Sequence, residues 1–209
     1  MKDIMEKVER LLNDNIYMHM VSGSTREGFR LHGSDLDMMS WLNNHRTIWD
    51  KSQFNYYSTT KKTLILSDSS ESPPGFALLE LLKPPTDSNI QSALITLNGR
   101  QYISSSLYRQ QTCSLTFPDS TEHGPCSSGE VLGIVYDIAQ SFACDFWPPP
   151  AHQWINRCQP CLRQKVVDDI VRNGCHFVPI GNSLSINVNE EWRISFSLAE
   201  QKIVYSMNH

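Results

Sequence analysis

The sequence lacks a long apolar run, an excess of basic charge and the cysteine density of a small secreted domain. No stretch of its 209 residues approaches the roughly 20 apolar residues that span a membrane as a helix. The formal net charge is −4, which gives no support for a dedicated nucleic-acid binder or a nucleic-acid activator. Residues 1–12 are charged and amphipathic and hold no signal-peptide core. We therefore predict a cytoplasmic protein without a membrane partner.

The cysteines are too sparse to predict a disulfide framework, although their number is even. They stand at positions 113, 126, 144, 158, 161 and 175. We expect them to be reduced. Cys158 and Cys161 have the spacing of a zinc-ligand pair, with His152, Cys175 or His176 as further candidates. A structural zinc site needs four ligands, commonly two close pairs, and only one clean pair is present, so free thiols in a loop are favoured.

The remaining composition is that of one globular domain, residues 1–209, with 40% hydrophobic and 19% charged residues. Apolar spacing predicts amphipathic helices over 4–12 and 165–174 and β-rich runs over 35–42, 63–66, 76–82 and 131–143. The Asn98-Gly99 pair between two β-rich runs predicts a hairpin. Residues 118–130 are predicted as a long polar loop. A strand pattern at 176–180, 185–188 and the start of 192–207 gives way to a helical one. The fold class is α/β (α+β), with more strands than helices.

Chemistry is concentrated in residues 23–37, GSTREGFRLHGSDLD. Gly23 allows close approach of the backbone to a ligand. Ser24 and Glu27 have capping-box spacing, and a helix N-terminus with a serine hydroxyl suits a phosphate. Asp35 and Asp37 would share one face of a strand, where two carboxylates repel unless a cation lies between them. These parts predict a triphosphate grip beside a Mg²⁺ site.

Each part alone is common by chance, and Asp35 and Asp37 could belong to a solvated turn after Gly33-Ser34. The apolar residues Met38 and Met39 follow at once and favour a strand that enters a core. A third acid is expected from a neighbouring strand. Asp137 is the preferred candidate, because it is the single charge in its β-rich run and needs a partner there. Its alternative is an aspartate at a strand edge that faces water, and Glu80 is the rival third acid.

An ordered set of motifs resembles the Mab-twenty-one domain family, which includes cyclic GMP-AMP synthase and its animal receptor-type relatives. The set comprises Gly23-Ser24, Glu27-Gly28, Ser34–Asp37, His123–Cys126, Tyr136–Ile138, Trp147-Pro148, Asn173–Cys175, Val178-Pro179 and Trp192–Glu200. The last run is the most specific. The resemblance covers residues from about 16 to the end, loosely over about 40–110.

The resemblance implies a nucleotidyltransferase fold, a mixed twisted sheet flanked by helices, with Asp35, Asp37 and Asp137 as the metal-binding catalytic acids. It implies that Ser24 holds the donor triphosphate. The side chains expected to face the nucleotide bases are Arg193, Ser195, Ser197 and Glu200. Arg193 can stack on a purine or bind it in a forked geometry. The cofactor would be Mg²⁺ or Mn²⁺, and the substrates ATP, GTP or both.

The implied reaction is attack of a ribose hydroxyl on the α-phosphate of a nucleoside triphosphate, with loss of pyrophosphate. Two rounds give a cyclic dinucleotide, a second messenger of innate immunity. One metal ion would lower the pKa of the attacking hydroxyl and another would stabilise the leaving charge.

Two departures from the family pattern keep other functions open. The family continues beyond the SFSLAE helix into a helical lobe, which we expect to be absent here. Cys158-Gln159-Pro160-Cys161 replaces an aromatic, arginine-rich stretch. The alternatives are therefore a catalytically silent member that binds a nucleotide or a protein, and a fragment without independent activity.

Overall fold

The computed structural model describes residues 16–23, 35–58, 62–85, 87–115, 119–158 and 162–207. The predicted helix over 4–12, the capping box at Ser24 and Glu27, and Cys161 lie outside these residues. The strands are β1 (Tyr17–Val21), β2 (Leu36–Leu42), β3 (His45–Ile48), β4 (Thr63–Asp68), β5 (Phe76–Leu81), β6 (Leu94–Leu97), β7 (Arg100–Ile103), β8 (Thr121–His123), β9 (Cys126–Val131), β10 (Ile134–Cys144), β11 (Cys175–Val178) and β12 (Trp192–Ser195). The helices are η1 (Lys51–Tyr56), α3 (Ser88–Ser92), α4 (Ser105–Leu115), η2 (Pro149–Ala151), α5 (His152–Cys158), α6 (Gln164–Arg172) and α7 (Ser197–Met207). None of these helices is long and apolar enough to cross a membrane.

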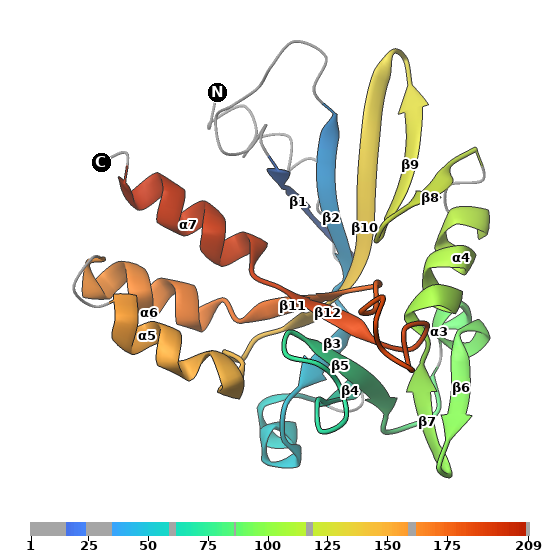
Figure 1. Ribbon diagram of the computed structural model, residues 1–209, viewed down its shortest axis with the longest axis horizontal. Helices are drawn as coiled ribbons and strands as arrows, with labels where there is room; N and C mark the ends of the chain where they lie inside the picture. Colours follow the sequence, from blue (N-terminus) through green and yellow to red (C-terminus); the bar gives the residue numbers. More distant parts are fainter. Residues whose placement is uncertain are drawn as a thin grey trace.

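One mixed sheet connects all the described strands, in the main order β1-β2-β10-β11-β12-β5-β4-β3 (Figure 1). The long strand β10 holds the sheet together. Its first half pairs in parallel with β2 and antiparallel with β9, and its end pairs antiparallel with β11. The hairpin of β6 and β7 branches from β5. This mixed α/β fold confirms the predicted class.

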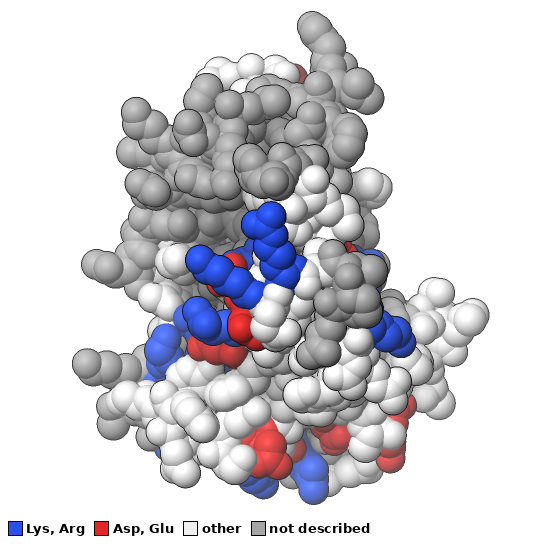
Figure 2. Space-filling view, turned by 90° about the vertical axis from the view of Figure 1, so that its left-hand side faces the viewer, with Lys and Arg blue, Asp and Glu red and all other residues white. Residues whose placement is uncertain are grey.

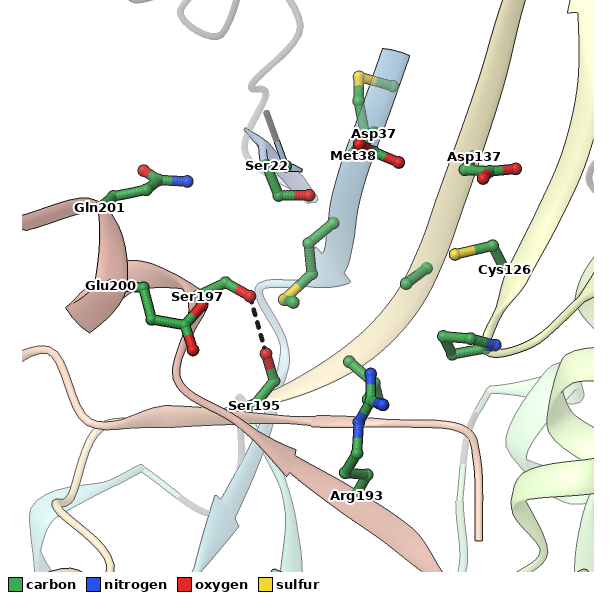
Figure 3. A pocket seen from close by; sticks show the side chains of 15 residues that line it. Ser22, Asp37, Met38, Cys126, Asp137, Arg193, Ser195, Ser197, Glu200 and Gln201 are labelled. Carbon is green, nitrogen blue, oxygen red and sulfur yellow. Dashed lines mark hydrogen bonds between the residues drawn. The ribbon is translucent and has the colours of Figure 1, made fainter. Parts of the chain in front are cut away.

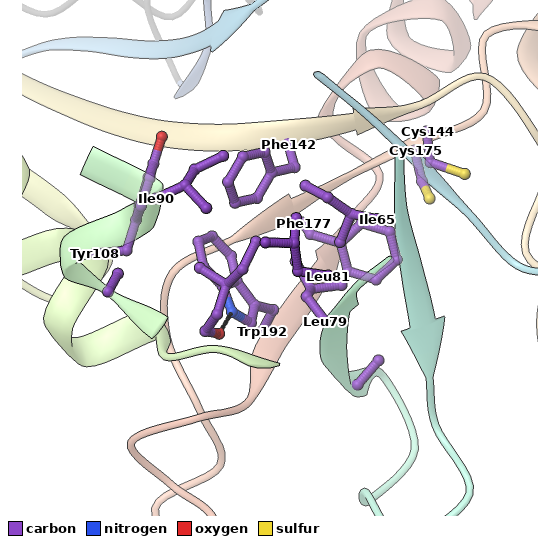
Figure 4. Close-up of a cluster of buried hydrophobic side chains, with 13 residues drawn as sticks. Ile65, Leu79, Leu81, Ile90, Tyr108, Phe142, Cys144, Cys175, Phe177 and Trp192 are labelled. Atoms are coloured by element: carbon purple, nitrogen blue, oxygen red, sulfur yellow. Dashed lines mark hydrogen bonds between the residues drawn. The ribbon is translucent and has the colours of Figure 1, made fainter. Parts of the chain in front are cut away.

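The alternation of side chains along β10, β11 and β12 separates a core from a polar face. Phe142, Phe177 and Trp192 are fully buried and pack together on one side of the sheet (Figure 4). The indole nitrogen of Trp192 donates a hydrogen bond of 2.7 Å to the Ile103 carbonyl, so its polar atom is satisfied inside the core. Because the side-chain period of a strand is two, Arg193 and Ser195 point to the opposite side.

Helix α7 lies over this opposite side and closes part of it. Leu198 of α7 packs against a small apolar cluster formed by Met20, Met39, Ala139 and Val178. On its other flank α7 packs against α6, with which it forms the ion pair between Lys202 and Asp169. The end of the molecule with α5, α6 and α7 is seen face-on in Figure 2, where Lys and Arg side chains gather beside acidic ones. The position of α7 is thus set by apolar contacts with the sheet and with Ile170 of α6, and the ion pair adds a charged contact.

Several predicted elements are confirmed. The predicted runs at 35–42, 63–66, 76–82 and 131–143 correspond to β2, β4, β5 and β10, and 165–174 corresponds to α6. The hairpin turn at Asn98 and Gly99 has positive φ at both residues, 50° and 76°, as a two-residue hairpin turn requires. The sequence WRISFSLAEQKIVYSM changes from strand β12 to helix α7.

Two sequence predictions are wrong, and one helix was missed. The polar segment 118–130 is not one long loop, because Thr121–His123 and Cys126–Val131 form a hairpin around Gly124. Residues 185–188 form turns rather than a strand. The helix α4 was not predicted, since its moderately polar sequence SSLYRQQTCSL carries only a weak apolar stripe. Cys113, Cys126, Cys144 and Cys175 are free thiols.

Candidate active site

Two carboxylates lie side by side on neighbouring parallel strands. Asp37 of β2 and Asp137 of β10 are direct partners in the register, so both side chains leave the same face of the sheet. Parallel neighbours are about 4.8 Å apart, which brings like charges close together. Burial raises the pKa of Asp37 above its ordinary value, and the charges of Asp137 and then Asp35 raise it further. A cation between the two strands would reverse this repulsion.

Strand β9 supplies the surroundings of Asp137. Ser128 lies opposite Asp137 in the antiparallel register, and its hydroxyl donates a hydrogen bond to Oδ1 of the carboxylate. The imidazole Nδ1 of His123, on β8, lies 3.7 Å from the other oxygen, Oδ2. Only Oδ1 of Asp137 is thus held by a hydrogen bond, since the largely exposed imidazole is too far from Oδ2 to donate one.

The turn after β1 is in close contact with Asp37. The Ser22 amide donates a hydrogen bond of 2.8 Å to the Asp37 carbonyl. Gly23 has φ of +67°, and a Cβ atom at this position would lie 2.0 Å from Oδ2 of Asp37. Glycine is thus required here both by the backbone conformation and by the space that the carboxylate occupies. The approach places the beginning of the predicted phosphate-binding segment next to the acids.

The opposite wall of the site comes from β12 and α7. Arg193 and Ser195 project from β12 on the side away from the core, and Ser197 and Glu200 follow on the first turn of α7. The hydroxyls of Ser195 and Ser197 are hydrogen-bonded to each other at 2.9 Å. This wall offers a guanidinium, two hydroxyls and a carboxylate, a set that can recognise the polar edges of a base.

These two walls enclose a cavity of about 330 Å³ (Figure 3). Figure 3 shows Asp37, Asp137 and Cys126 on one side of it and Arg193, Ser195, Ser197 and Glu200 on the other. Met39, Ala139 and Val178 form an apolar floor. The complete lining consists of Ser22, Gly23, Asp37, Met38, Met39, Pro125, Cys126, Asp137, Ala139, Val178, Arg193, Ser195, Ser197, Glu200 and Gln201. The volume is that of a small-ligand site.

The cavity brings together most of the residues singled out from the sequence. Asp35 is exposed directly before β2 and is not part of the lining, and Ser24 lies outside the described residues. Glu80, the rival third acid, is on β5 beside Arg100 and away from the cavity. The sequence did not single out Ser22, Ser128 or Gln201, and it named Cys126 only within the His123–Cys126 motif, without a role in the site. Only the strand pairing places Cys126 and Ser128 here, because their segment was predicted to be a loop.

The expected ion, Mg²⁺, requires hard oxygen donors. Among the described residues, no three His, Cys, Asp or Glu side chains are grouped so that they could hold a metal ion. Mg²⁺ is commonly bound through one or two carboxylates together with substrate phosphates. The carboxylates of Asp37 and Asp137 fit that pattern, because they are hard oxygen donors that lie close together and oppose each other's ionisation.

Paired carboxylates that face an arginine across a polar cavity are typical of proteins that handle a nucleotide with a divalent cation. Residues 89–206 match the model of the Mab-21 protein nucleotidyltransferase domain, and this match spans more than half of the chain. The chain therefore belongs to the Mab-21 nucleotidyltransferase family, whose substrates are nucleotides. The matched range includes Asp137, Arg193 and Glu200, whereas Gly23 and Asp37 precede it. A comparison with curated proteins gave no match.

Proposed function

We propose that this protein is a Mg²⁺- or Mn²⁺-dependent nucleotidyltransferase that joins ATP, GTP or both into a cyclic dinucleotide. Its place would be innate immune signalling in the cytoplasm, as in the cyclic GMP-AMP synthase-like receptors that the sequence resembles. The observation that carries the proposal is the in-register pair of Asp37 and Asp137 across one cavity from Arg193. Family membership supports the nucleotidyltransferase class and leaves product and trigger to experiment.

Each wall of the cavity has a part in this proposal. Asp37 and Asp137 hold the metal ions on the sheet, with Asp35 joining them from its exposed position before β2. Gly23 and Ser24 hold the donor triphosphate beside the acids. Arg193, Ser195, Ser197 and Glu200 orient the base on the opposite wall, and the apolar floor at Met39 excludes water beneath the ribose.

The reaction forms a bond between a ribose hydroxyl oxygen and the α-phosphorus and breaks the bond from that phosphorus to the β-phosphate oxygen. Pyrophosphate leaves with the electron pair, and the hydroxyl proton passes to solvent. Bound Mg²⁺ or Mn²⁺ would lower the pKa of the hydroxyl and stabilise the leaving charge. The chain contributes position, because holding the reactants in line removes most of the entropic barrier to the encounter.

The test compares Asp37→Asn and Asp137→Asn with the wild type in thermal unfolding with ATP or GTP, with and without Mg²⁺ or Mn²⁺. Ligand that binds only the folded state raises the melting temperature by mass action. We expect a metal-dependent rise in the wild type that both variants lose. Glu80→Gln is the matched control, since it makes the same carboxyl-to-amide change outside the cavity.

Product analysis then separates the enzyme from a silent member of the family. Incubation with ATP, GTP and Mn²⁺, followed by chromatography and mass spectrometry, should show a cyclic dinucleotide. Stabilisation without product would identify a nucleotide-binding protein without catalysis. No stabilisation of a well-folded wild type would refute the metal–nucleotide site itself.

A further inference from the structure

A buried glutamine connects the two walls of the cavity. Gln201 lies one residue after Glu200 on α7, and its side chain is almost fully buried while lining the same cavity. Its amide nitrogen Nε2 donates a hydrogen bond of 2.9 Å to the carbonyl of Val21. Figure 3 shows the Gln201 side chain on the same side of the cavity as Glu200. Val21 is the last residue of β1, and the two partners are 180 positions apart in the sequence.

The partner of this hydrogen bond leads directly to the acids. Val21 is followed by Ser22, whose amide bonds to the Asp37 carbonyl, and by Gly23, which touches the Asp37 carboxylate. On the other side, Gln201 is preceded by Glu200 and, one turn earlier, by Ser197. A single side chain thus spans from the helix that carries the base-facing residues to the turn that leads into the phosphate-binding segment.

We propose that Gln201 is a positioning residue that fixes the distance between the base-binding wall and the triphosphate-binding turn. This inference rests on the proposed function of the cavity. A nucleoside triphosphate has a base and a phosphate tail at a set separation, and it binds best when both subsites are held at that separation beforehand. Leu198 fixes α7 over the sheet through apolar contact, which allows sliding, whereas a buried hydrogen bond defines one register.

The test exploits a ligand that occupies one subsite only. Tripolyphosphate with Mg²⁺ should use the phosphate subsite, whereas ATP or GTP with Mg²⁺ needs both. In Gln201→Met the side chain keeps its length and loses its donor. We expect ATP or GTP to bind about three- to tenfold more weakly, the range for one lost buried hydrogen bond, while tripolyphosphate affinity is unchanged. Calorimetric titration well below the melting temperature measures both affinities.

Lys202→Met is the matched control, because Lys202 ties the same helix to Asp169 of α6 instead of to β1. It should leave the ratio of the two affinities unchanged. Gln201→Asn, which keeps the amide but is too short to reach Val21, should repeat the effect of Gln201→Met and replaces it if that variant does not fold.

Three outcomes overturn the inference, and they can be told apart. If the Gln201 variants lose both ligands equally, Gln201 supports the fold and not the spacing. If they retain both affinities, the hydrogen bond does not position the subsites. If the wild type itself binds neither ligand, the proposed function fails together with this inference.

Discussion

At the scale of single residues, the site holds a carboxylate whose ionisation is unfavourable in the folded protein. Asp37 lies partly buried next to Asp137, and its raised pKa shows that ionisation is opposed by burial and by its acidic neighbours. Without a cation the folded protein bears this cost at neutral pH, and the unfolded chain does not. Such local strain is common where a ligand is to be bound.

We therefore predict that Asp37→Asn stabilises the protein in the absence of metal. The amide keeps the shape of the carboxylate and removes the repulsion from Asp137, so the melting temperature should rise by a few degrees in the presence of a chelator. The same substitution should abolish stabilisation by Mg²⁺ and nucleotide. A lower melting temperature in chelator would show that the Asp37 charge is compensated in the folded state.

A second residue-scale prediction concerns Ser128, whose hydroxyl orients Asp137. Groups that orient a metal ligand commonly contribute 10- to 100-fold to metal affinity. Ser128→Ala should weaken Mn²⁺ binding in the presence of nucleotide by about tenfold. A Mn²⁺ titration followed by electron paramagnetic resonance gives the affinity. Glu130→Ala, on an exposed position of the same strand, is the control and should leave Mn²⁺ affinity unchanged.

At the scale of elements, two β-hairpins with the same kind of two-residue turn differ in the first residue of that turn. Asn98 and Gly99 join β6 to β7, and Leu132 and Gly133 join β9 to β10, with positive φ at all four positions. Leu132 is 97% exposed in this turn. A left-handed backbone suits asparagine and opposes a residue with a bulky side chain. The β9–β10 turn is thus less favourable than its counterpart.

Exchange of the turn residues tests this difference. Leu132→Asn should stabilise the protein by about 1 kcal/mol, and Asn98→Leu should destabilise it by a similar amount. Urea unfolding of both variants measures the two changes. If both substitutions shift the free energy of unfolding in the same direction, backbone conformation does not govern these turns.

The same elements show how far sequence patterns reach. The alternation in Trp192-Arg193-Ile194-Ser195 correctly predicts which side chains face the core and which face the cavity. Successive residues of a strand point to opposite faces, so a strand between an apolar and a polar environment alternates apolar and polar residues. Strand β9 was missed because its outer half is exposed and its inner half carries small polar side chains, a composition shared with loops. Hydrophobic periodicity reveals an element when one of its faces is buried and therefore apolar. Strand β9 has little such periodicity and is defined mainly by its pairing with β10.

At the scale of the whole molecule, the candidate site depends on contacts between distant segments. Asp37 and Asp137 could be paired from motif order, since strands with acids at corresponding positions suggest a common face. The hydrogen bond between Gln201 and Val21 joins the two ends of the described chain and has no local sequence signal. Residues that link the two walls of the cavity, such as Gln201, can be identified only when the topology is known.

Two buried histidines make the stability of the whole fold depend on pH. His45 packs edge-on against Phe142, and His176 lies against Trp41, with ring centroids 5.9 and 4.4 Å apart. Neither ring nitrogen of either residue has a hydrogen-bond partner among the described residues. Burial is the main cause that lowers the pKa of each from 6.5 to about 4. Both rings are therefore neutral in the folded protein at pH 5.

The sign of the effect follows from proton binding. Below pH 6.5 the unfolded chain protonates these histidines while the folded protein does not, so the free energy of unfolding decreases as the pH falls from 6.5 to about 4. Each histidine contributes up to about 3 kcal/mol to this loss. Urea unfolding at pH 7, 5.5 and 4.5 should show a progressive decrease that is smaller in His45→Gln/His176→Gln. The exposed His152→Gln should retain the wild-type slope, and an unchanged slope in the double variant would assign the acid sensitivity to carboxylates instead.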